Sequence, residues 1–153
     1  MTTITWEFKK DLHQFCLAHA REKIYRIEQL LQSNYRDLGS ASKSSVGDKH
    51  ETSRAMLHLE QENYSKQLLQ AQKNLNILSQ IKCGPQNAIS SGALIRTNQG
   101  IFYMSVGIGE ILFKKTSVFL ISPKSPIGQK MIGKTNAIEF RFNKIEYYIE
   151  SVV

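Results

Sequence analysis

Two acidic residues three positions apart, Asp48 and Glu51, have a type and a spacing suited to chemistry. Mg²⁺ binds hard carboxylate oxygens and keeps much of its water when only one or two carboxylates hold it. The same Asp-x-x-Glu spacing at the start of a helical run also forms a capping box, in which the two side chains satisfy free backbone amides. Both interpretations stay open, and they are compatible because a cap stiffens the start of the helix.

His50 lies between the two acidic residues, so Asp48, His50 and Glu51 together are a candidate metal site. Residue i+2 on a helix points away from residue i, and no further ligand cluster follows, so the sequence disfavours a self-contained site. Cys16 and Cys83 match no metal-ligand spacing, and a reduced cytosolic pair is the simpler interpretation. The remaining histidines fall in helical segments and are interpreted as surface or seam residues: His13, His19 and His58.

A seven-residue repeat of apolar side chains follows the acidic pair and predicts a coiled-coil seam. A second apolar seam precedes the pair, and between the two seams lies 39–47, which is small, polar and poor in helix formers. Helices joined by so short a loop run antiparallel. The sequence therefore predicts a helical hairpin from 5–38 and 50–82, with its tip near 39–51. The repeat that carries this prediction is Leu57, Tyr64, Ala71 and Leu78.

The composition changes near Gly84-Pro85, a typical helix stop. All three prolines and six of the nine glycines follow residue 84, which divides the chain into 1–84 and 85–153. The second part alternates apolar and polar residues and has a turn signal at Asn143-Lys144, which predicts an antiparallel sheet with one short helical turn. The predicted strands are Ala93–Thr97, Ile101–Val106, Ser117–Ile121, Ala137–Phe142 and Ile145–Val152.

Composition and charge narrow the class of protein. Hydrophobic residues make up 41% and charged residues 22% of 153 residues, and no apolar run approaches the roughly 18–20 residues of a membrane helix. The N-terminus lacks the pattern of a secretory signal, so we expect a cytoplasmic protein with no membrane partner. The net charge of +7 is spread over both parts of the chain and lacks the dense basic stripe of a dedicated DNA-binding protein.

Two motifs resemble one known family. The segment Ile121-Ser-Pro-Lys-Ser-Pro-Ile-Gly-Gln-Lys-Met-Ile-Gly-Lys134 resembles the C-terminal domain of the bacterial Gre transcription elongation factors, in which a strand ends in Ser-Pro before a small helix and a Gly-Lys. Gly47-Asp-Lys-His-Glu51 resembles the acidic tip of their helical hairpin. The resemblance implies an α+β protein with an N-terminal coiled-coil hairpin and a C-terminal FKBP-like antiparallel β domain.

The resemblance also implies a function. In that family the hairpin enters the secondary channel of RNA polymerase, and its tip carboxylates help hold a second Mg²⁺ at the polymerase active centre. Asp48 and Glu51 match this role. The resemblance also implies that the chain has no cofactor of its own and that it contacts nucleic acid only indirectly or near the transcript 3′ end. The matching polymerase-docking residues are Ser125 and Pro126, with Ile127 as an apolar contact and Lys124 and Lys130 adding charge.

Three functions remain open at this stage. A Gre-like factor stimulates cleavage of backtracked transcripts as an accessory protein, since the catalytic centre is the polymerase's. A channel-binding regulator without cleavage activity is the alternative, because Thr-Ser-Arg-Ala-Met follows Glu51 and places the positive charge of Arg54 beside the pair. A prolyl isomerase built on the FKBP-like domain rests on fold analogy alone, which does not establish function.

Overall fold

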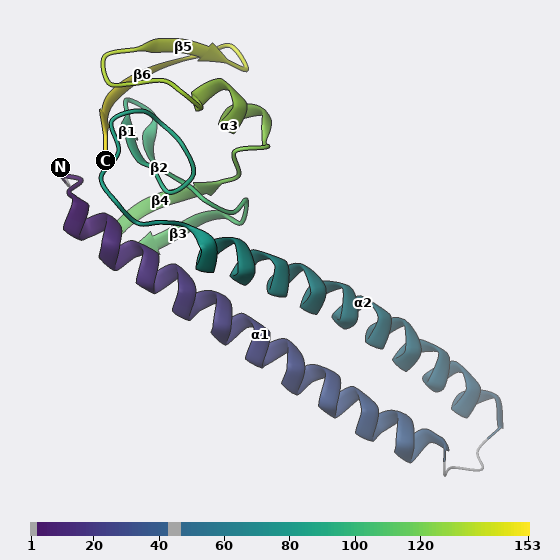
Figure 1. Cartoon of the computed structure of the whole chain (residues 1–153). Helices are drawn as coiled ribbons and strands as arrows, with labels where there is room; N and C mark the ends of the chain where they lie inside the picture. The colour runs from purple at the N-terminus through teal and green to yellow at the C-terminus, as the bar shows by residue number, and fades with distance from the viewer. Residues whose placement is uncertain (1–2, 43–46) are drawn as a thin grey trace. The chain divides into compact units, whose positions relative to one another are not determined.

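The computed structural model describes the backbone of residues 3–42 and 47–153 (Figure 1). It describes the side chains of the same residues except those that fall within 41–50. Their contacts group them into two compact units. The β unit combines the N-terminal segment through Leu17 with Ile77–Val153, and the hairpin unit is Ala18–Asn76. The contacts therefore place the start of the first long helix with the strands, although that helix lies far from them in sequence.

The two long helices are α1 (Trp6–Ser42) and α2 (Gly47–Gln80). Helix α1 begins after Thr5, whose Oγ1 accepts a hydrogen bond from the Phe8 amide at 3.0 Å. Such a side-chain cap satisfies one of the free amides at a helix start. Helix α2 ends a few residues before Gly84, where the sequence predicts a helix stop.

Within the hairpin unit the two helices pack along the predicted seam. Ile27 and Leu31 of α1 are buried with Ala71 of α2. Farther along α1, the side-chain amide of Asn34 donates to the backbone oxygen of Leu57 at 2.9 Å. Residues later in α1 thus meet residues earlier in α2, so the helices are antiparallel and the predicted hairpin is confirmed.

Helix α1 extends past the position where the sequence predicts a loop. It continues through Gly39 to Ser42. No atom lies within 4 Å of the position that a Cβ on Gly39 would occupy, so no neighbouring group opposes a helix there. A glycine costs a helix only about 1 kcal/mol relative to alanine, and extending a helix is far easier than starting one. The remainder of the predicted tip loop, 43–46, lies outside the described residues.

Within the described ranges, the β unit contains one six-stranded sheet in the order β3-β4-β2-β1-β6-β5. A short helix, α3 (Pro126–Met131), follows β4. The predicted α+β class, a helical hairpin followed by a β domain with one short helix, is confirmed. The strands are β1 (Leu94–Thr97), β2 (Gly100–Met104), β3 (Gly109–Phe113), β4 (Thr116–Ile121), β5 (Glu139–Phe142) and β6 (Ile145–Val152).

Two features of the sheet differ from the prediction. Strand β3 was not predicted, because its turn to β4 consists of Lys114 and Lys115, at φ 48° and 63°, where glycine or asparagine usually marks a turn. The sheet is also not wholly antiparallel: β2 and β4 pair in parallel, with Ile101 opposite Val118. The parallel pair follows from the unpredicted strand, because β3 lies outside β4 and lets the chain return beside β2 in the same direction.

The sheet buries side chains on both faces. Successive residues of a strand point to opposite faces. Phe102 and Met104 of β2 belong to a core cluster that includes Met131 of α3. Tyr103, between them, lies against His13 of α1 on the other face. Burial on both sides explains why β2 is an almost continuous run of buried apolar residues.

Candidate functional site

The predicted tip carboxylates lie at the turn end of the hairpin unit. Asp48 and Glu51 are the second and fifth residues of α2. Glu51 is exposed to solvent, whereas the side chain of Asp48 lies outside the described residues. The backbone is already helical at Gly47, so Asp48 lies inside the first turn and not at the cap position that a capping box requires. Positions three apart on a helix are neighbours, which places both residues on one side of α2.

The predicted docking corner forms the start of α3. Ser125 is the N-cap residue, and its hydroxyl oxygen accepts a hydrogen bond from the Gly128 amide at 3.1 Å. Pro126 occupies the first helical position, where its lack of an amide hydrogen costs nothing. The structure therefore confirms the Ser-Pro helix start that the sequence indicates.

Ser122 and Gly128 also shape this corner, and sequence reasoning missed both. The Ser125 hydroxyl donates to the backbone oxygen of Ser122 at 2.6 Å, and the Ser125 amide donates to the same oxygen at 3.1 Å. A Cβ on Gly128 would lie 2.0 Å from that oxygen, so only glycine fits there. The Ser-Pro-x-Ser-Pro-x-Gly spacing carries the signal, but the close approach is visible only in three dimensions.

The predicted docking residues differ in exposure. Lys124, Pro126 and Lys130 are exposed, and Ser125 is half-buried. Ile127, predicted as an apolar contact for a partner, is half-buried and packs against the core cluster of the β unit. The exposed isoleucine of this corner is Ile132, the C-cap residue of α3, which is 41% exposed.

A buried cation joins three segments of the β unit. Lys9 of α1 is fully buried, although lysine is rarely buried without a charged partner. Its ammonium group donates to the backbone oxygens of Gly84 at 2.6 Å and Val153 at 2.9 Å. Burial lowers the pKa of Lys9. The contacts fasten the start of α1 to the segment after α2 and to the end of β6.

One helical turn later, His13 is buried against the sheet. Its Nδ1 lies 2.8 Å from the hydroxyl oxygen of Tyr103, and the two rings meet edge to face. Burial lowers the pKa of His13, and the positive charge of Lys9 lowers it further. Burial also raises the pKa of Cys16, three residues on, to about 12, so this thiol is unreactive. The interpretation of His13 as a surface or seam residue is therefore wrong.

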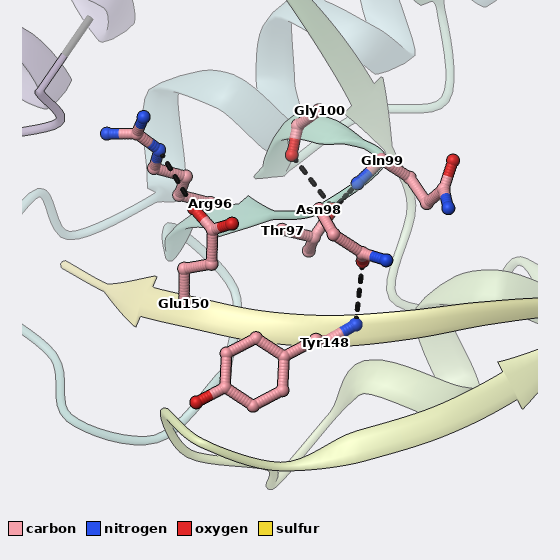
Figure 2. Close-up of polar contacts among 7 residues, drawn as sticks. All are labelled: Arg96, Thr97, Asn98, Gln99, Gly100, Tyr148 and Glu150. Carbon is pink, nitrogen blue, oxygen red and sulfur yellow. Dashed lines mark hydrogen bonds and ion pairs between the residues drawn. The ribbon is translucent and has the colours of Figure 1, made fainter. Parts of the chain in front are cut away.

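A cavity of about 300 Å³ lies at the turn between β1 and β2. Its polar side chains are engaged in the fold (Figure 2). Arg96 Nε pairs with the Glu150 carboxylate at 3.1 Å, and the Asn98 side-chain oxygen accepts the Tyr148 amide at 2.7 Å. These contacts fasten the turn to β6, which gives the polar groups a structural role. The lining residues are Arg96, Thr97, Asn98, Gly100, Ile101, Thr116 and Ser117.

Two further observations concern metals and membranes. Over the described part of the chain, no three His, Cys, Asp or Glu side chains lie close enough together to hold a metal ion. None of the helices in these ranges combines the length and apolar character that a bilayer span requires. Among the described side chains, Glu51 belongs to no such group, and the side chains of Asp48 and His50 lie outside the described residues.

Comparisons with known proteins add little to this geometry. No family model matches the sequence, and no curated protein matches it. The solved structure of the transcription factor Gfh1 is similar over 90% of this chain and 92% of that chain, with 16% identity and a TM-score of 0.36. A likeness at this level establishes neither a shared family nor a shared function.

Proposed function

We propose that this chain is a Gre-like transcription elongation factor. It binds RNA polymerase through the secondary channel and stimulates cleavage of backtracked transcripts by helping the polymerase position Mg²⁺. The observation that supports this most is the placement of two motifs: the acidic pair at the turn end of a long hairpin, and the Ser-Pro corner at the start of α3. The family resemblance assigns a function to each of these two places.

The hairpin suits the delivery of side chains into a narrow channel. Helix α1 has 37 residues and α2 has 34. At 1.5 Å per residue each helix is about 50–55 Å long. The hairpin unit buries few side chains, and a two-helix rod encloses no substrate pocket. Its length can carry Asp48 and Glu51 to an active centre that the chain does not itself contain.

The chemistry of the pair fits an accessory role. Two carboxylates near a helix start bind Mg²⁺ weakly alone, because the ion keeps much of its water. They can complete a site that the polymerase half supplies, and two metals then stabilise the attacking water and the leaving oxygen of the cleaved transcript. The chain would meet nucleic acid only near the transcript 3′ end, and it would act in the cytoplasm without a cofactor of its own.

The β unit would bind the polymerase. We assign docking at the rim of the channel to Ser125 and Pro126, whose corner is held by hydrogen bonds to Ser122. Lys124 and Lys130 are exposed and would raise the association rate with a negatively charged surface. A docking site on the β unit leaves the hairpin unit available for the channel.

A channel-binding regulator without cleavage activity is the second candidate. Arg54 follows Glu51 by three residues on α2, so the two positions are neighbours on the helix. Its positive charge opposes the approach of a divalent cation to the pair. Such a protein would occupy the channel and block substrate entry, with the carboxylates serving only the start of the helix.

The prolyl isomerase interpretation has less support. An isomerase pocket needs exposed aromatic walls, but the aromatic rings of the β unit pack on one another. Phe140 and Tyr147 stack with ring centres 4.9 Å apart, and Phe102 and Phe119 stack at 5.4 Å. These rings belong to or border the core cluster, so their role is to fill the interior.

A transcript-cleavage assay on stalled elongation complexes tests the proposal. The wild type should accelerate cleavage, and the Asp48→Asn, Glu51→Gln double variant should lose about a hundredfold or more of that rate, since a metal ligand contributes several kcal/mol at about 1.4 kcal/mol per tenfold. Polymerase binding should persist. A control variant, Glu60→Gln, changes another exposed acid of α2 and should cleave normally.

The outcomes separate the candidates. A folded double variant with full cleavage activity would contradict the Mg²⁺ role. A wild type that binds polymerase and blocks transcription without stimulating cleavage would favour the regulator. A wild type that does not bind polymerase would exclude both candidates.

A further inference from the structure

Strand β5 forms one open edge of the sheet. It is the last strand in the order β3-β4-β2-β1-β6-β5, and Figure 1 shows it as the outermost strand at that end of the β unit. An edge strand presents a row of backbone amides and carbonyls that can pair with another chain, and natural proteins usually cover or charge such an edge. The residue pattern of β5 therefore decides which strand can pair with it.

The outward-facing backbone groups of β5 are those of Glu139 and Arg141. The β5–β6 hairpin has a two-residue turn, Asn143-Lys144, with φ of 49° and 66°. In such a hairpin the closing pair, here Phe142 with Ile145, exchanges hydrogen bonds, and bonded pairs recur at every second residue. The amides and carbonyls of Glu139 and Arg141 therefore point away from β6. Among the described residues, no hydrogen bond reaches these groups.

Opposite charges alternate along the exposed face of β5. The side chains of Glu139 and Arg141 are exposed, and Arg141 Nε lies 3.4 Å from the Glu146 carboxylate on β6. Antiparallel pairing of two β5 strands about Phe140 places Glu139 of each copy directly opposite Arg141 of the other. Like charges at these positions would repel a second copy, whereas here each acid meets a base. The charges of this edge thus favour pairing with the same strand of a second copy.

The other face of β5 is complementary to itself in the same register. The Ile149 amide donates to the Ile138 oxygen at 2.9 Å, so Ile138 continues the pairing of β5 with β6 by one residue. Ile138 therefore shares a face with Phe140 and Phe142. It is 39% exposed, and Phe142 is half-buried. Pairing about Phe140 places Ile138 of each copy opposite Phe142 of the other, so apolar side chains meet apolar side chains.

The other edge strand, β3, lacks this complementarity. Its two-residue turn directs the amides of Glu110 and Leu112 outward by the same alternation. Pairing of two β3 strands about Ile111 would place Glu110 opposite Leu112 of the second copy, so a charge would meet an apolar side chain. Lys114, at the end of β3, is already paired with Asp11 of α1 at 2.9 Å. Of the two edges, β5 is the one that fits a second copy.

We propose that β5 strands from two copies of this chain pair antiparallel about a twofold axis at Phe140. The pairing joins two six-stranded sheets into one continuous sheet. Each Glu139–Arg141 pair also exchanges backbone hydrogen bonds between the copies. The contact uses one short strand from each copy, so the dimer is reversible and depends on protein concentration. This inference does not depend on the proposed function, which concerns the hairpin tip and the α3 corner.

Charge reversal tests the register of the two strands. Sedimentation velocity of the full chain over a concentration series should show wild type dimerising as its concentration rises. Glu139→Arg sets base against base in both pairs and should weaken dimerisation about tenfold or more. Arg141→Glu sets acid against acid and should do the same. An equimolar mixture of the two variants should dimerise like wild type, because each pair then joins an acidic and a basic side chain again.

A matched control separates the β5 edge from charge in general. Glu110→Arg makes the same change of charge at an exposed position of the β3 edge and should dimerise like wild type. Glu139→Arg leaves the Arg141–Glu146 ion pair and the backbone pairing of β5 with β6 in place. Its circular dichroism and thermal unfolding should therefore match those of wild type.

Hydrogen exchange tests the backbone pairing without any substitution. In dilute wild type the amides of Glu139 and Arg141 should exchange as unprotected amides, and their exchange should slow as the concentration rises. The amides of Glu110 and Leu112 on the β3 edge should stay unprotected at every concentration. Added salt should weaken the dimer, because its ion pairs are exposed.

The remaining outcomes overturn the inference. If wild type stays monomeric at every concentration, β5 does not pair, and the proposed function stands wherever polymerase binding persists. If Glu139→Arg dimerises like wild type, or the mixed variants fail to dimerise, the two copies do not meet in this register. If Glu110 and Leu112 become protected in place of Glu139 and Arg141, the interface is β3. A wild type that dimerises in this way but does not bind polymerase would refute the proposed function alone.

Discussion

The hairpin unit and the β unit bury their side chains to very different extents. Of the side chains described in the hairpin unit, only four are buried: Ile27, Leu31, Asn34 and Ala71. The β unit packs both faces of its sheet and adds a buried lysine and histidine from α1. A two-helix rod gives length with little core, whereas a sheet covered on both faces gives stability with little reach. The proposed function uses both properties and assigns one to each unit.

One buried position of the hairpin unit is polar. Asn34 is 1% exposed, and its side-chain oxygen has no hydrogen-bond partner among the described residues. A polar residue in a coiled-coil seam lowers stability but fixes which residues face each other. The hairpin thus has a small core and one polar residue that fixes the register of its two helices, so its stability depends on few contacts.

The largest expected effect comes from removing the same side chain in each unit. Ile149→Ala in the β unit and Ile27→Ala in the hairpin unit each delete a buried isoleucine, at 0% and 4% exposure. Large-to-alanine changes cost about 2–5 kcal/mol, and more where the site cannot collapse. The loss of unfolding free energy should lie near the upper end of this range for Ile149→Ala and near the lower end for Ile27→Ala.

Urea unfolding measures both losses. Fluorescence of Trp6, the single tryptophan, reports the β unit, and far-ultraviolet circular dichroism is dominated by the long helices. Equal losses in the two variants would show that the hairpin unit is packed as tightly as the β unit, contrary to the comparison.

Glycine replacement should have opposite signs in the two units. Gly128→Ala brings a Cβ within 2.0 Å of the Ser122 oxygen, and overpacking of this kind costs about 1–3 kcal/mol. Gly39→Ala meets no neighbour within 4 Å inside a helix, and should stabilise the hairpin by about 0.5–1 kcal/mol. Thermal unfolding of both variants checks the signs, and a stabilising Gly128→Ala would mean that the α3 corner is not closed as described.

A smaller effect should appear in the β unit as the pH falls. The pKa of His13 is lowered by burial and by Lys9, so the folded protein favours the neutral ring. The stabilisation is complete above the unfolded pKa of about 6.5 and is lost as pH falls below it toward the lowered folded value, at about 1.4 kcal/mol per pKa unit.

Neighbouring groups set the limits of this test. Two titratable groups act on His13 directly: Lys9 on α1, whose positive charge lowers the His13 pKa, and Tyr103 on β2, whose hydroxyl oxygen lies 2.8 Å from the His13 Nδ1. His13→Asn keeps a hydrogen-bonding atom near the Nδ1 position and should flatten the pH dependence seen by Trp6 fluorescence. An unchanged slope in this variant would assign the dependence to another group.

Much of the fold was predictable because it rests on local patterns. The seven-residue repeat through Tyr64 and Ala71 predicts the hairpin, and Asn143-Lys144 predicts the β5–β6 turn, since both signals lie within a few residues of their effect. Strand β3 was missed because Lys114 and Lys115 adopt a turn conformation that their side chains do not favour. Such a turn is stabilised by the pairing around it, which a local pattern does not contain.

Only part of the candidate site was predictable from the sequence. The Ser125 cap and Pro126 are sequence neighbours, so their pattern shows the helix start. The burial of Ile127 and the exposure of Ile132 depend on which side of a six-residue helix meets the sheet. The burial of Lys9 depends on segments 75 and 144 residues away, and no local signal marks it.

The β unit is formed by two segments that lie far apart in sequence, and this affects how the chain folds during synthesis. The first turns of α1 leave the ribosome early, yet the partners of Lys9 and His13 include Gly84, Tyr103 and Val153, which are made much later. Contacts in the hairpin unit span shorter stretches of sequence, and such contacts form sooner than long-range strand pairing. We therefore expect the newly made chain to form its hairpin first, and Lys9 to gain its second backbone partner only after Val153 has emerged.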